Sequence, residues 1–510
     1  MAQVSSHNTL SPAWAKQQNK HFTKQRANKI ARNAVTSMDI MSAARDISTM
    51  RTYTDTYGIA IPKVGEITNQ RHSGRCWMFA SYNVARQETM KFLDVDTFEF
   101  SQAYGMFYDK LEKANATLEY IISTRDKDLE SREVEYLLDG VAADGGYFFY
   151  AMNLIRKWGV VPKDAMPETA CSENSEQMDN QLARLLHKDI FELRTQAEQG
   201  ASVETLHDLK DEMLKEIYTF LCICLGNPPE SFDLHIEVGS KCKADASKIH
   251  TVLPEPQDDE KDDSQKSKAK VKDKAKDEDE EKDHKDRVTV LYDTNLTPQE
   301  FTKKYVPFNP EEYIQLTSIP SSKFEYNKVY HVQFDDSVLG GFAARFLNVE
   351  PEVLEQAAIS ALKDGRPVSM ACDVCQQFPR YIDDFKYILA TDTVDMNGLF
   401  GIDFDMSRPS MVDTHETGLT HAMTFQGVQL DKKGKPQAWR IENSWGKDAG
   451  KDGYLIMSSD WFRLYGGEID IARKYLSSQL LDIWDNGVDI EVMPWSNMGR
   501  ALNLRKKIAV

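Results

Sequence analysis

The chain has 510 residues, 41% of them hydrophobic, so it is long enough for more than one domain and for a sizeable core. Its formal net charge of −18 argues against nucleic-acid binding, because a phosphate backbone is bound by a basic surface. No apolar run approaches the roughly 18 residues of a membrane helix, and the seven scattered cysteines favour a reduced compartment over a disulfide framework.

Residues 1–58 are predicted to form an N-terminal arm. Its first residues, 1–14, are polar where a signal peptide would need an apolar block, so we expect a cytoplasmic protein. Basic residues are frequent up to residue 32, and residues 28–46 favour a helix. Two interpretations of the arm stay open: it docks on a neighbouring subunit, or it lies in solvent.

Residues 59–170 are predicted to be a helical half that carries a candidate nucleophile. Cys76 stands where a Ser-Gly turn gives way to Trp77–Leu93, a run without Gly or Pro that predicts a helix. A thiol in the first turn of a helix meets unpaired N–H groups and the positive end of the helix dipole, and both favour the thiolate. The alternative is that Cys76 is a small buried hydrophobic residue.

Apolar residues at helical spacing and abundant charge from residue 176 to 225 predict a helical insertion, which we place at residues 171–254. The next segment, residues 255–287, holds 14 acidic and 10 basic side chains and three apolar residues. Burial of three apolar side chains cannot offset the conformational entropy lost when the backbone is ordered, which is about 1–2 kcal/mol per residue. We therefore predict a disordered charged loop; a single solvent-exposed helix and a partner-binding segment are the alternatives.

Residues 288–485 are predicted to form a strand-rich half, and residues 486–510 a C-terminal tail. Pro351 opens an expected helix that runs to Lys363. Short apolar blocks beyond it, separated by Gly, Asp and Lys clusters, favour an antiparallel sheet or barrel. The expected strands are Val368–Cys372, His421–Val428, Ala438–Asn443, Gly453–Met457 and Glu468–Ile471.

A nucleophilic cysteine needs a base and a third group that aims the base. The strand-rich half offers His421 at the start of one strand and Asn443 at the end of the next, which can meet at one end of a sheet. A lone histidine on an apolar strand is more often an ordinary half-buried residue. The joint occurrence of the three motifs, however, favours a Cys76, His421 and Asn443 site.

Other groupings were weighed against this site. His72 is nearer to Cys76 in sequence, but it has no Asn partner in view. Cys372 and Cys375 have the spacing of a redox or zinc pair, but no second pair stands at a suitable distance, and Cys222 and Cys224 are too close for a usual zinc knuckle. We interpret both pairs as packing residues. We expect no metal and no organic cofactor, although a reductant should be needed to keep Cys76 reduced.

The motifs resemble those of a known family. Three motifs together are similar to those of the papain superfamily of cysteine peptidases. They are Gln70 six residues before Cys76-Trp77, Thr420-His421-Ala422-Met423, and Asn443-Ser444-Trp445-Gly446. The sequence of residues 67–77 resembles that of one branch of this superfamily, the bleomycin hydrolases and aminopeptidases C. The C-terminal residues Pro494-Trp495 and Met498-Gly499 resemble the same branch. The 345 residues between Cys76 and His421 exceed the roughly 130–150 of small papain-like enzymes, which agrees with the large insertions of this branch.

The resemblance implies an α+β, papain-like fold with a helical half and an antiparallel β-barrel-like half, and a role for each motif residue. Cys76 is the nucleophile and His421 the base and acid, paired as thiolate and imidazolium. Asn443 orients the His421 ring, Trp445 shields it, and Gln70 supplies a hydrogen bond to the oxyanion. Such a donor is typically worth about 2.7–4 kcal/mol in the transition state.

The resemblance also implies a broad-specificity aminopeptidase that assembles as a homohexamer and places its own C-terminus in the active-site cleft. Family members end near the Met498-Gly499-Arg500-Ala501-Leu502 point, whereas this chain continues to Val510 with three cations. We therefore expect peptide substrates and a tail that is trimmed or rerouted. The alternatives are an oligopeptide endopeptidase on the same scaffold and a nucleic-acid-binding or scaffold protein, the latter disfavoured by the acidity.

Overall fold

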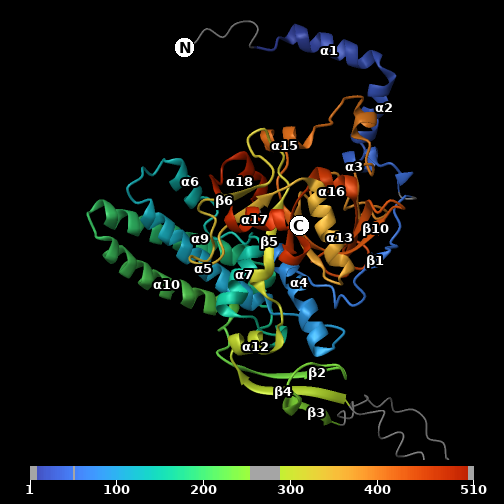
Figure 1. Cartoon of the computed structure of the whole chain (residues 1–510). Coiled ribbons are helices and arrows are strands. Elements are labelled where there is room, and N and C mark those ends of the chain that lie inside the picture. Colours follow the sequence, from blue (N-terminus) through green and yellow to red (C-terminus); the bar gives the residue numbers. More distant parts are fainter. Residues whose placement is uncertain (1–8, 50–51, 253–287, 504–510) are drawn as a thin grey trace, which may run out of the picture.

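The structure is a computed structural model that describes residues 9–49, 52–252 and 288–503 (Figure 1). The predicted charged loop, residues 255–287, and the end of the tail after residue 503 lie outside these ranges. Among the residues described, no helix is both long enough and apolar enough to cross a membrane.

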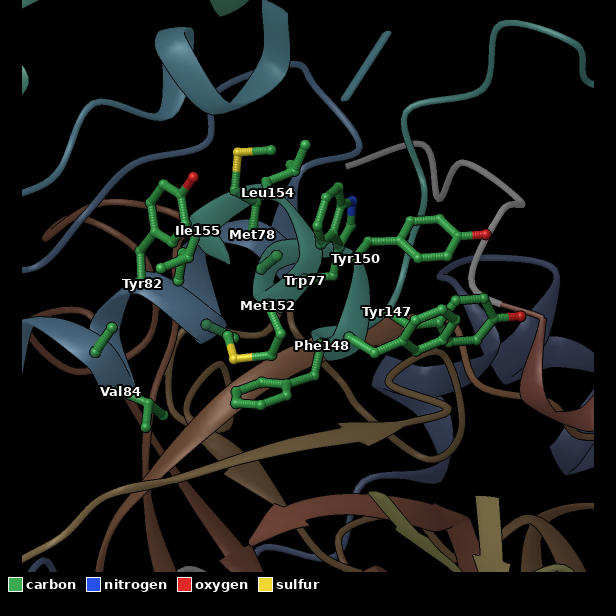
Figure 2. Close-up of a cluster of buried hydrophobic side chains, with 14 of the residues drawn as sticks. Trp77, Met78, Tyr82, Val84, Tyr147, Phe148, Tyr150, Met152, Leu154 and Ile155 are labelled. Atoms are coloured by element: carbon green, nitrogen blue, oxygen red, sulfur yellow. The ribbon is translucent and has the colours of Figure 1, made fainter. Parts of the chain in front are cut away.

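A long buried helix, α4 (Cys76–Leu93), lies at the centre of the molecule, as the absence of Gly and Pro predicted. Helix α7 (Phe148–Trp158) packs against it, and Figure 2 shows the aromatic and sulfur side chains that fill their contact. Trp77 meets Tyr150 edge-on, with ring centroids 5.7 Å apart. Every residue of the first three turns of α4 is buried, so packing fixes this helix on all sides.

Helices α5 (Gln102–Ser123), α9 (Glu176–Glu198) and α10 (Val203–Leu225) form a second helical layer. They pack on one another around a separate hydrophobic cluster, and α9 and α10 run side by side as a hairpin (Figure 1). This confirms the helices predicted between residues 176 and 225. The smaller helices of this region are α6 (Arg132–Leu138), α8 (Ala170–Glu173) and α12 (Pro298–Tyr305).

The strand-rich half is built on one large sheet with the order β14-β6-β7-β5-β13-β8-β10-β11-β12-β9. The predicted strands are present as β8 (Val368–Cys372), β10 (His421–Leu430), β11 (Pro436–Glu442), β12 (Tyr454–Ser458) and β13 (Gly466–Ala472). These five pair antiparallel, whereas β5 with β7, β6 with β14 and β9 with β12 pair parallel.

The α+β class is therefore confirmed, but the sheet is mixed rather than purely antiparallel, and its ladder does not close into a barrel within the described residues. The strands that sequence patterns did not indicate are short: β1 (Ile59–Ala60), β5 (Tyr313–Thr317), β6 (Lys328–Val332), β7 (Arg345–Asn348), β9 (Ile388–Leu389) and β14 (Ile490–Val492).

Helix α13 (Pro351–Lys363) has the bounds that were predicted and covers one face of the large sheet. Helix α4 contacts β8 and β10 directly, so the start of α4 meets the large sheet. The remaining helices of this half are α14 (Met396–Phe400), α15 (Arg408–Thr414), α16 (Ser459–Tyr465), α17 (Ser478–Asn486) and α18 (Asn497–Leu502).

A small second sheet, seen at the foot of Figure 1, has the order β2-β4-β3. Its strands are β2 (Phe232–Glu237), β3 (Ile249–Val252) and β4 (Val288–Leu296). The first two belong to the predicted helical insertion and the third to the predicted strand-rich half. Hydrogen bonds thus join both sides of the boundary placed between these units, and the domain boundaries stay predictions.

The arm extends from the body as α1 (Pro12–Lys24) and α2 (Arg26–Val35), followed by α3 (Ile40–Ala44) (Figure 1). Ser11 caps α1 through its side chain, which accepts a hydrogen bond from the Trp14 N–H at 3.1 Å. Neither α1 nor α2 contains a buried residue. The helix expected over residues 28–46 is thus two shorter helices, because the chain turns at residues 36–39.

Candidate active site

Cys76 is the first residue of α4, and its side chain is 6% exposed. No side chain caps this helix start, which leaves its first N–H groups available to the thiol. The N–H groups of Cys76, Trp77 and Ala422 face the thiol and act to lower its pKa. Since Ala422 is the second residue of β10, the sulfur lies against the strand that begins with His421.

His421 is the first residue of β10 and is 1% exposed. Its Nε2 lies 2.8 Å from Oδ1 of Asn443, the residue that directly follows β11. The antiparallel pairing of β10 with β11 brings these two residues to the same end of the sheet. The structure thus gathers Cys76, His421 and Asn443 at one place, from positions 345 and 22 residues apart.

The hydrogen bonds around Asn443 determine the tautomer of His421. The Ser444 N–H, which can only donate, meets Asn443 Oδ1 at 2.8 Å, so this atom is an acceptor. His421 Nε2 must therefore carry a hydrogen and donate it to the same oxygen. In the neutral imidazole this leaves Nδ1 as the nitrogen that can accept a proton.

Trp445 covers the histidine as the resemblance implied. Its ring stacks on His421 with the centroids 4.7 Å apart and the planes at 28°. The Arg380 guanidinium lies 6.0 Å from the centre of the same indole. This indole restricts the orientations open to the imidazole and limits access of water to it.

Gln70 is 2% exposed and is held between the cysteine turn and the Asn443 loop. Its Oε1 accepts a hydrogen bond from the Ser444 hydroxyl, and its Nε2 donates to the Ser73 carbonyl, both at 2.7 Å. The Gln70 N–H donates to the Ser444 carbonyl at 2.8 Å. An amide nitrogen has two hydrogens, so Nε2 keeps one donor beyond the bond to Ser73.

Burial dominates the electrostatics of the two reacting groups. It raises the pKa of the Cys76 thiol to about 11 and lowers the pKa of His421 to about 4, where the Arg380 charge acts in the same direction. Both shifts favour the neutral forms of the isolated groups. A thiolate and an imidazolium side by side would oppose these shifts, because each charge stabilises the other, so the ion pair stays a prediction.

A buried ionic cluster around Asp144, which the sequence motifs did not indicate, supports the cysteine turn. Asp144 Oδ2 accepts hydrogen bonds from the Gly74 N–H at 2.8 Å and the Ser175 hydroxyl at 2.5 Å, and its backbone carbonyl accepts from Trp77 Nε1 at 2.8 Å. The Lys110 ammonium is 2.7 Å from Asp144 Oδ1. Asp144 thus holds the residues on both sides of Cys76.

The charges of this cluster depend on one another. Burial acts to raise the pKa of Asp144, but the Lys110 ammonium and the hydrogen bonds outweigh it and hold this pKa below its usual range. Asp179 lies 2.8 Å from the same ammonium, yet burial raises its pKa to about 6. Lys110 carries its charge, because the two carboxylates more than offset the burial that would lower its pKa.

The last described residues of the chain also approach the site. The Ala501 carbonyl, in α18, accepts a hydrogen bond from the Leu419 N–H at 2.7 Å, two residues before His421. Met498 and Leu502 are fully buried beside it. The end of the described chain is therefore fixed next to the strand that carries the histidine.

The alternative groupings from the sequence do not form a second site. His72 is exposed, and its N–H donates to the Glu173 carbonyl at 2.9 Å. Cys372 is fully buried and pairs with His421 in the sheet, whereas Cys375 is exposed, so the interpretation as a packing residue is wrong for Cys375. Within the described ranges, no three His, Cys, Asp or Glu side chains form a metal-binding group.

A cysteine at the start of a buried helix, with a histidine and an asparagine at one end of a sheet, defines a papain-like cysteine peptidase. The chain belongs to the Peptidase C1-like family, whose sequence model matches residues 9–250 and 277–499. The family predicted from the motifs is therefore confirmed.

Named relatives span nearly the whole chain. Aminopeptidase C of Lactobacillus delbrueckii subsp. lactis is 32% identical over 481 residues, which cover 94% of this chain and 95% of that protein. Aminopeptidase W of the same organism is 32% identical over 489 residues, with 96% and 99% covered. The crystal structure of PepW from Lactobacillus rhamnosis HN001 superposes with a TM-score of 0.83 at 31% identity, covering 97% of this chain and 99% of that one. These relatives confirm the predicted enzyme type, a cysteine aminopeptidase.

Proposed function

We propose that this chain removes N-terminal residues from peptides through a thioester formed on Cys76. His421, Asn443 and Gln70 are the other residues of the proposed active site. The observation that carries the proposal is the Cys76, His421 and Asn443 arrangement at the start of α4. The relatives named aminopeptidase support it, because they match this chain over almost its entire length.

In the first half of the reaction, His421 Nδ1 takes the proton from the Cys76 thiol, and the sulfur attacks the carbonyl carbon of the first peptide bond. The resulting oxyanion accepts hydrogen bonds from the second Gln70 Nε2 hydrogen and from the Cys76 N–H. His421 then gives its proton to the departing amine, and the C–N bond breaks. The products are a thioester of the N-terminal residue and a shortened peptide.

In the second half, His421 Nδ1 takes a proton from a water molecule that attacks the thioester carbonyl. The C–S bond breaks, the sulfur recovers the proton from His421, and the free amino acid leaves. Asn443 contributes by holding Nε2–H of the ring, which leaves Nδ1 to exchange the proton in both halves. Neither half needs a metal or an organic cofactor.

Recognition of the free N-terminus is proposed to depend on the C-terminal segment. The hydrogen bond from Leu419 to Ala501 supports this, because it holds the segment two residues from the start of β10. The residues after Leu502 include three cations, and positive charge disfavours the binding of a substrate ammonium group. We propose that the tail is trimmed or rerouted before the enzyme reaches full activity.

The test compares an aminoacyl fluorogenic amide with its N-acetylated twin, using the full chain and a chain that ends at Leu502. We expect hydrolysis of the free-amine substrate only, at a higher rate with the shortened chain. The matched Cys76→Ala variant should lose activity by at least about 10³-fold. Preference for the acetylated substrate would favour the endopeptidase instead, and full activity of Cys76→Ala would overturn the assignment of the nucleophile.

We also propose a cytoplasmic homo-oligomer, a hexamer by family resemblance. The arm supports assembly: residues 9–46 carry seven basic and two acidic side chains in a chain whose net charge is −18. Leu10, Trp14, Ile30 and Met38 expose 48–80% of their surface on this arm. A basic arm with exposed apolar residues fits the acidic surface of a second copy.

A further inference from the structure

Three cysteines lie near the base of the α9–α10 hairpin. Cys171 is in α8, just before α9, and Cys222 and Cys224 are in the last turn of α10. All three are partly buried free thiols that pack at the edge of the same hydrophobic cluster. None of them has a part in the proposed reaction.

Two of these cysteines face each other. The Thr169 hydroxyl, at the N-cap of α8, donates to the Cys224 carbonyl at 3.1 Å, which ties the end of α10 to the first turn of α8. Cys171 is the second residue of that turn, and its thiol is a hydrogen-bonding neighbour of the Cys224 thiol. Cys222, two residues earlier on the helix, neighbours Tyr218 instead.

Helix α8 also contacts the turn that carries Cys76. The Ser172 carbonyl accepts a hydrogen bond from Arg75 Nη2 at 2.8 Å, and the Glu173 carbonyl accepts from the His72 N–H at 2.9 Å. Arg75 additionally pairs with Glu168, just before α8, at 2.9 Å. The facing thiols therefore lie between the helical hairpin and the segment that supports the cysteine turn.

We propose that Cys171 and Cys224 form an oxidation site that takes a disulfide from a small-molecule disulfide such as oxidised glutathione. Both thiols are partly accessible, and the Thr169 bond to the Cys224 carbonyl holds the first turn of α8 against the end of α10. The bond would close the base of the α9–α10 hairpin and fix α8 beneath the cysteine turn.

The reaction balances as two exchanges. The Cys171 thiolate attacks one sulfur of oxidised glutathione, which breaks its S–S bond and releases one reduced glutathione. The Cys224 thiol then loses its proton and attacks the Cys171 sulfur, releasing the second glutathione. The protein loses two hydrogens, and one glutathione disulfide becomes two thiols. Burial, reinforced by Cys171, raises the pKa of Cys224 to about 11, so little Cys224 thiolate is present at neutral pH to attack glutathione directly.

The experiment treats the full-length Cys76→Ala variant, which lacks the reactive active-site thiol, with oxidised glutathione and maps its peptides without reduction. We expect one cross-link between the peptides of Cys171 and Cys224, which dithiothreitol removes. The oxidised protein should unfold several degrees higher, because the closed loop limits its unfolded chain. Mapping of the wild-type chain should give the same cross-link.

Three variants in the same background sharpen the result. In Cys224→Ser, Cys171 should retain a single glutathione, because the second thiol is missing. Cys222→Ser and Cys242→Ser should leave the cross-link unchanged, since Cys242 packs against a different cluster. The proposal is overturned if Cys171 and Cys224 each stay free or carry separate glutathiones, or if Cys222 replaces Cys224 in the cross-link.

Discussion

Asp144 holds the position of Cys76 through its neighbours on both sides, although it does not touch the thiol in any described hydrogen bond. Its side chain holds the Gly74 N–H, and its carbonyl holds the Trp77 indole. An added Cβ at Gly74 would lie 2.7 Å from the Asp144 Cβ, so the turn and the carboxylate are packed together tightly. This carboxylate keeps its charge because Lys110 is buried beside it.

Replacing Lys110 with Met should therefore destabilise the protein and reduce its activity. The change leaves the buried Asp144 and the partly buried Asp179 carboxylates without their cation, and breaking a buried ion pair costs about 3–5 kcal/mol. The measurement is urea unfolding together with the rate on the free-amine substrate. The matched control is Lys215→Met, whose ion pair with Glu212 is exposed and whose loss should change little. Equal stability of the two variants would contradict the role given to Lys110.

Cys76, His421 and Asn443 could be predicted because each lies in a short motif with a specific sequence. The Lys110, Asp144 and Asp179 cluster could not, because its members come from a helix, a loop and another helix with no shared period. Charged residues at helical spacing are normally solvated, and only packing shows that the Lys110 side chain is 1% exposed. The pKa shifts of Cys76 and His421 likewise depend on burial, which local sequence does not specify.

Among the elements, long periodic helices and fully buried strands were the most predictable. Helix α13 and strand β8 have the predicted bounds. Strands of two to four residues, such as β1 and β7, carry too few residues to show a period. Their pairing is decided by contacts with distant strands.

Strand β6 contains a histidine whose charge ties it to β14. His331 Nδ1 is 2.9 Å from Glu491, and its Nε2 is 3.5 Å from Asp336. These two carboxylates, Asp336 foremost, raise the pKa of His331 from 6.5 to about 9. Because the folded protein holds this proton more tightly than the unfolded chain, the stabilisation is fully present below about pH 6.5 and is lost as the pH rises through 9.

We therefore expect the unfolding temperature of the wild-type protein to fall between about pH 6 and about pH 10 by several degrees more than that of His331→Gln. Differential scanning calorimetry at both pH values gives the comparison. His250→Gln, at an exposed position in β3, is the control and should follow the wild type. A parallel decline of all three proteins would show that His331 contributes nothing in this range.

At the scale of the whole molecule, the N-terminal arm packs least against the rest of the described chain. Helices α1 and α2 bury no side chain within the chain, yet they carry Trp14 and Ile30 at 48% and 56% exposure. Isolated helices of 10 to 13 residues are marginal in water, and we propose that this arm packs on a second copy of the chain.

Replacing Trp14 and Ile30 together with Glu should lower the oligomeric mass in solution, because two charges would enter the proposed contact. Light scattering coupled to size exclusion measures this mass. Leu129→Glu is the matched control, since Leu129 is also 56% exposed but lies on the body rather than the arm. An unchanged mass in the double variant would show that the arm does not hold the assembly together.

The distance between Cys76 and its partners also has a consequence in time. The nucleophile is synthesised 345 residues before His421, and at about 5–20 residues per second this interval lasts roughly 20–70 s. Throughout that interval the growing chain carries the cysteine without a base, and Asn443 follows later still. In the proposed mechanism His421 is the base, so a ribosome-bound chain would not hydrolyse peptides before the strand-rich half emerges, and a prematurely terminated product would be inert.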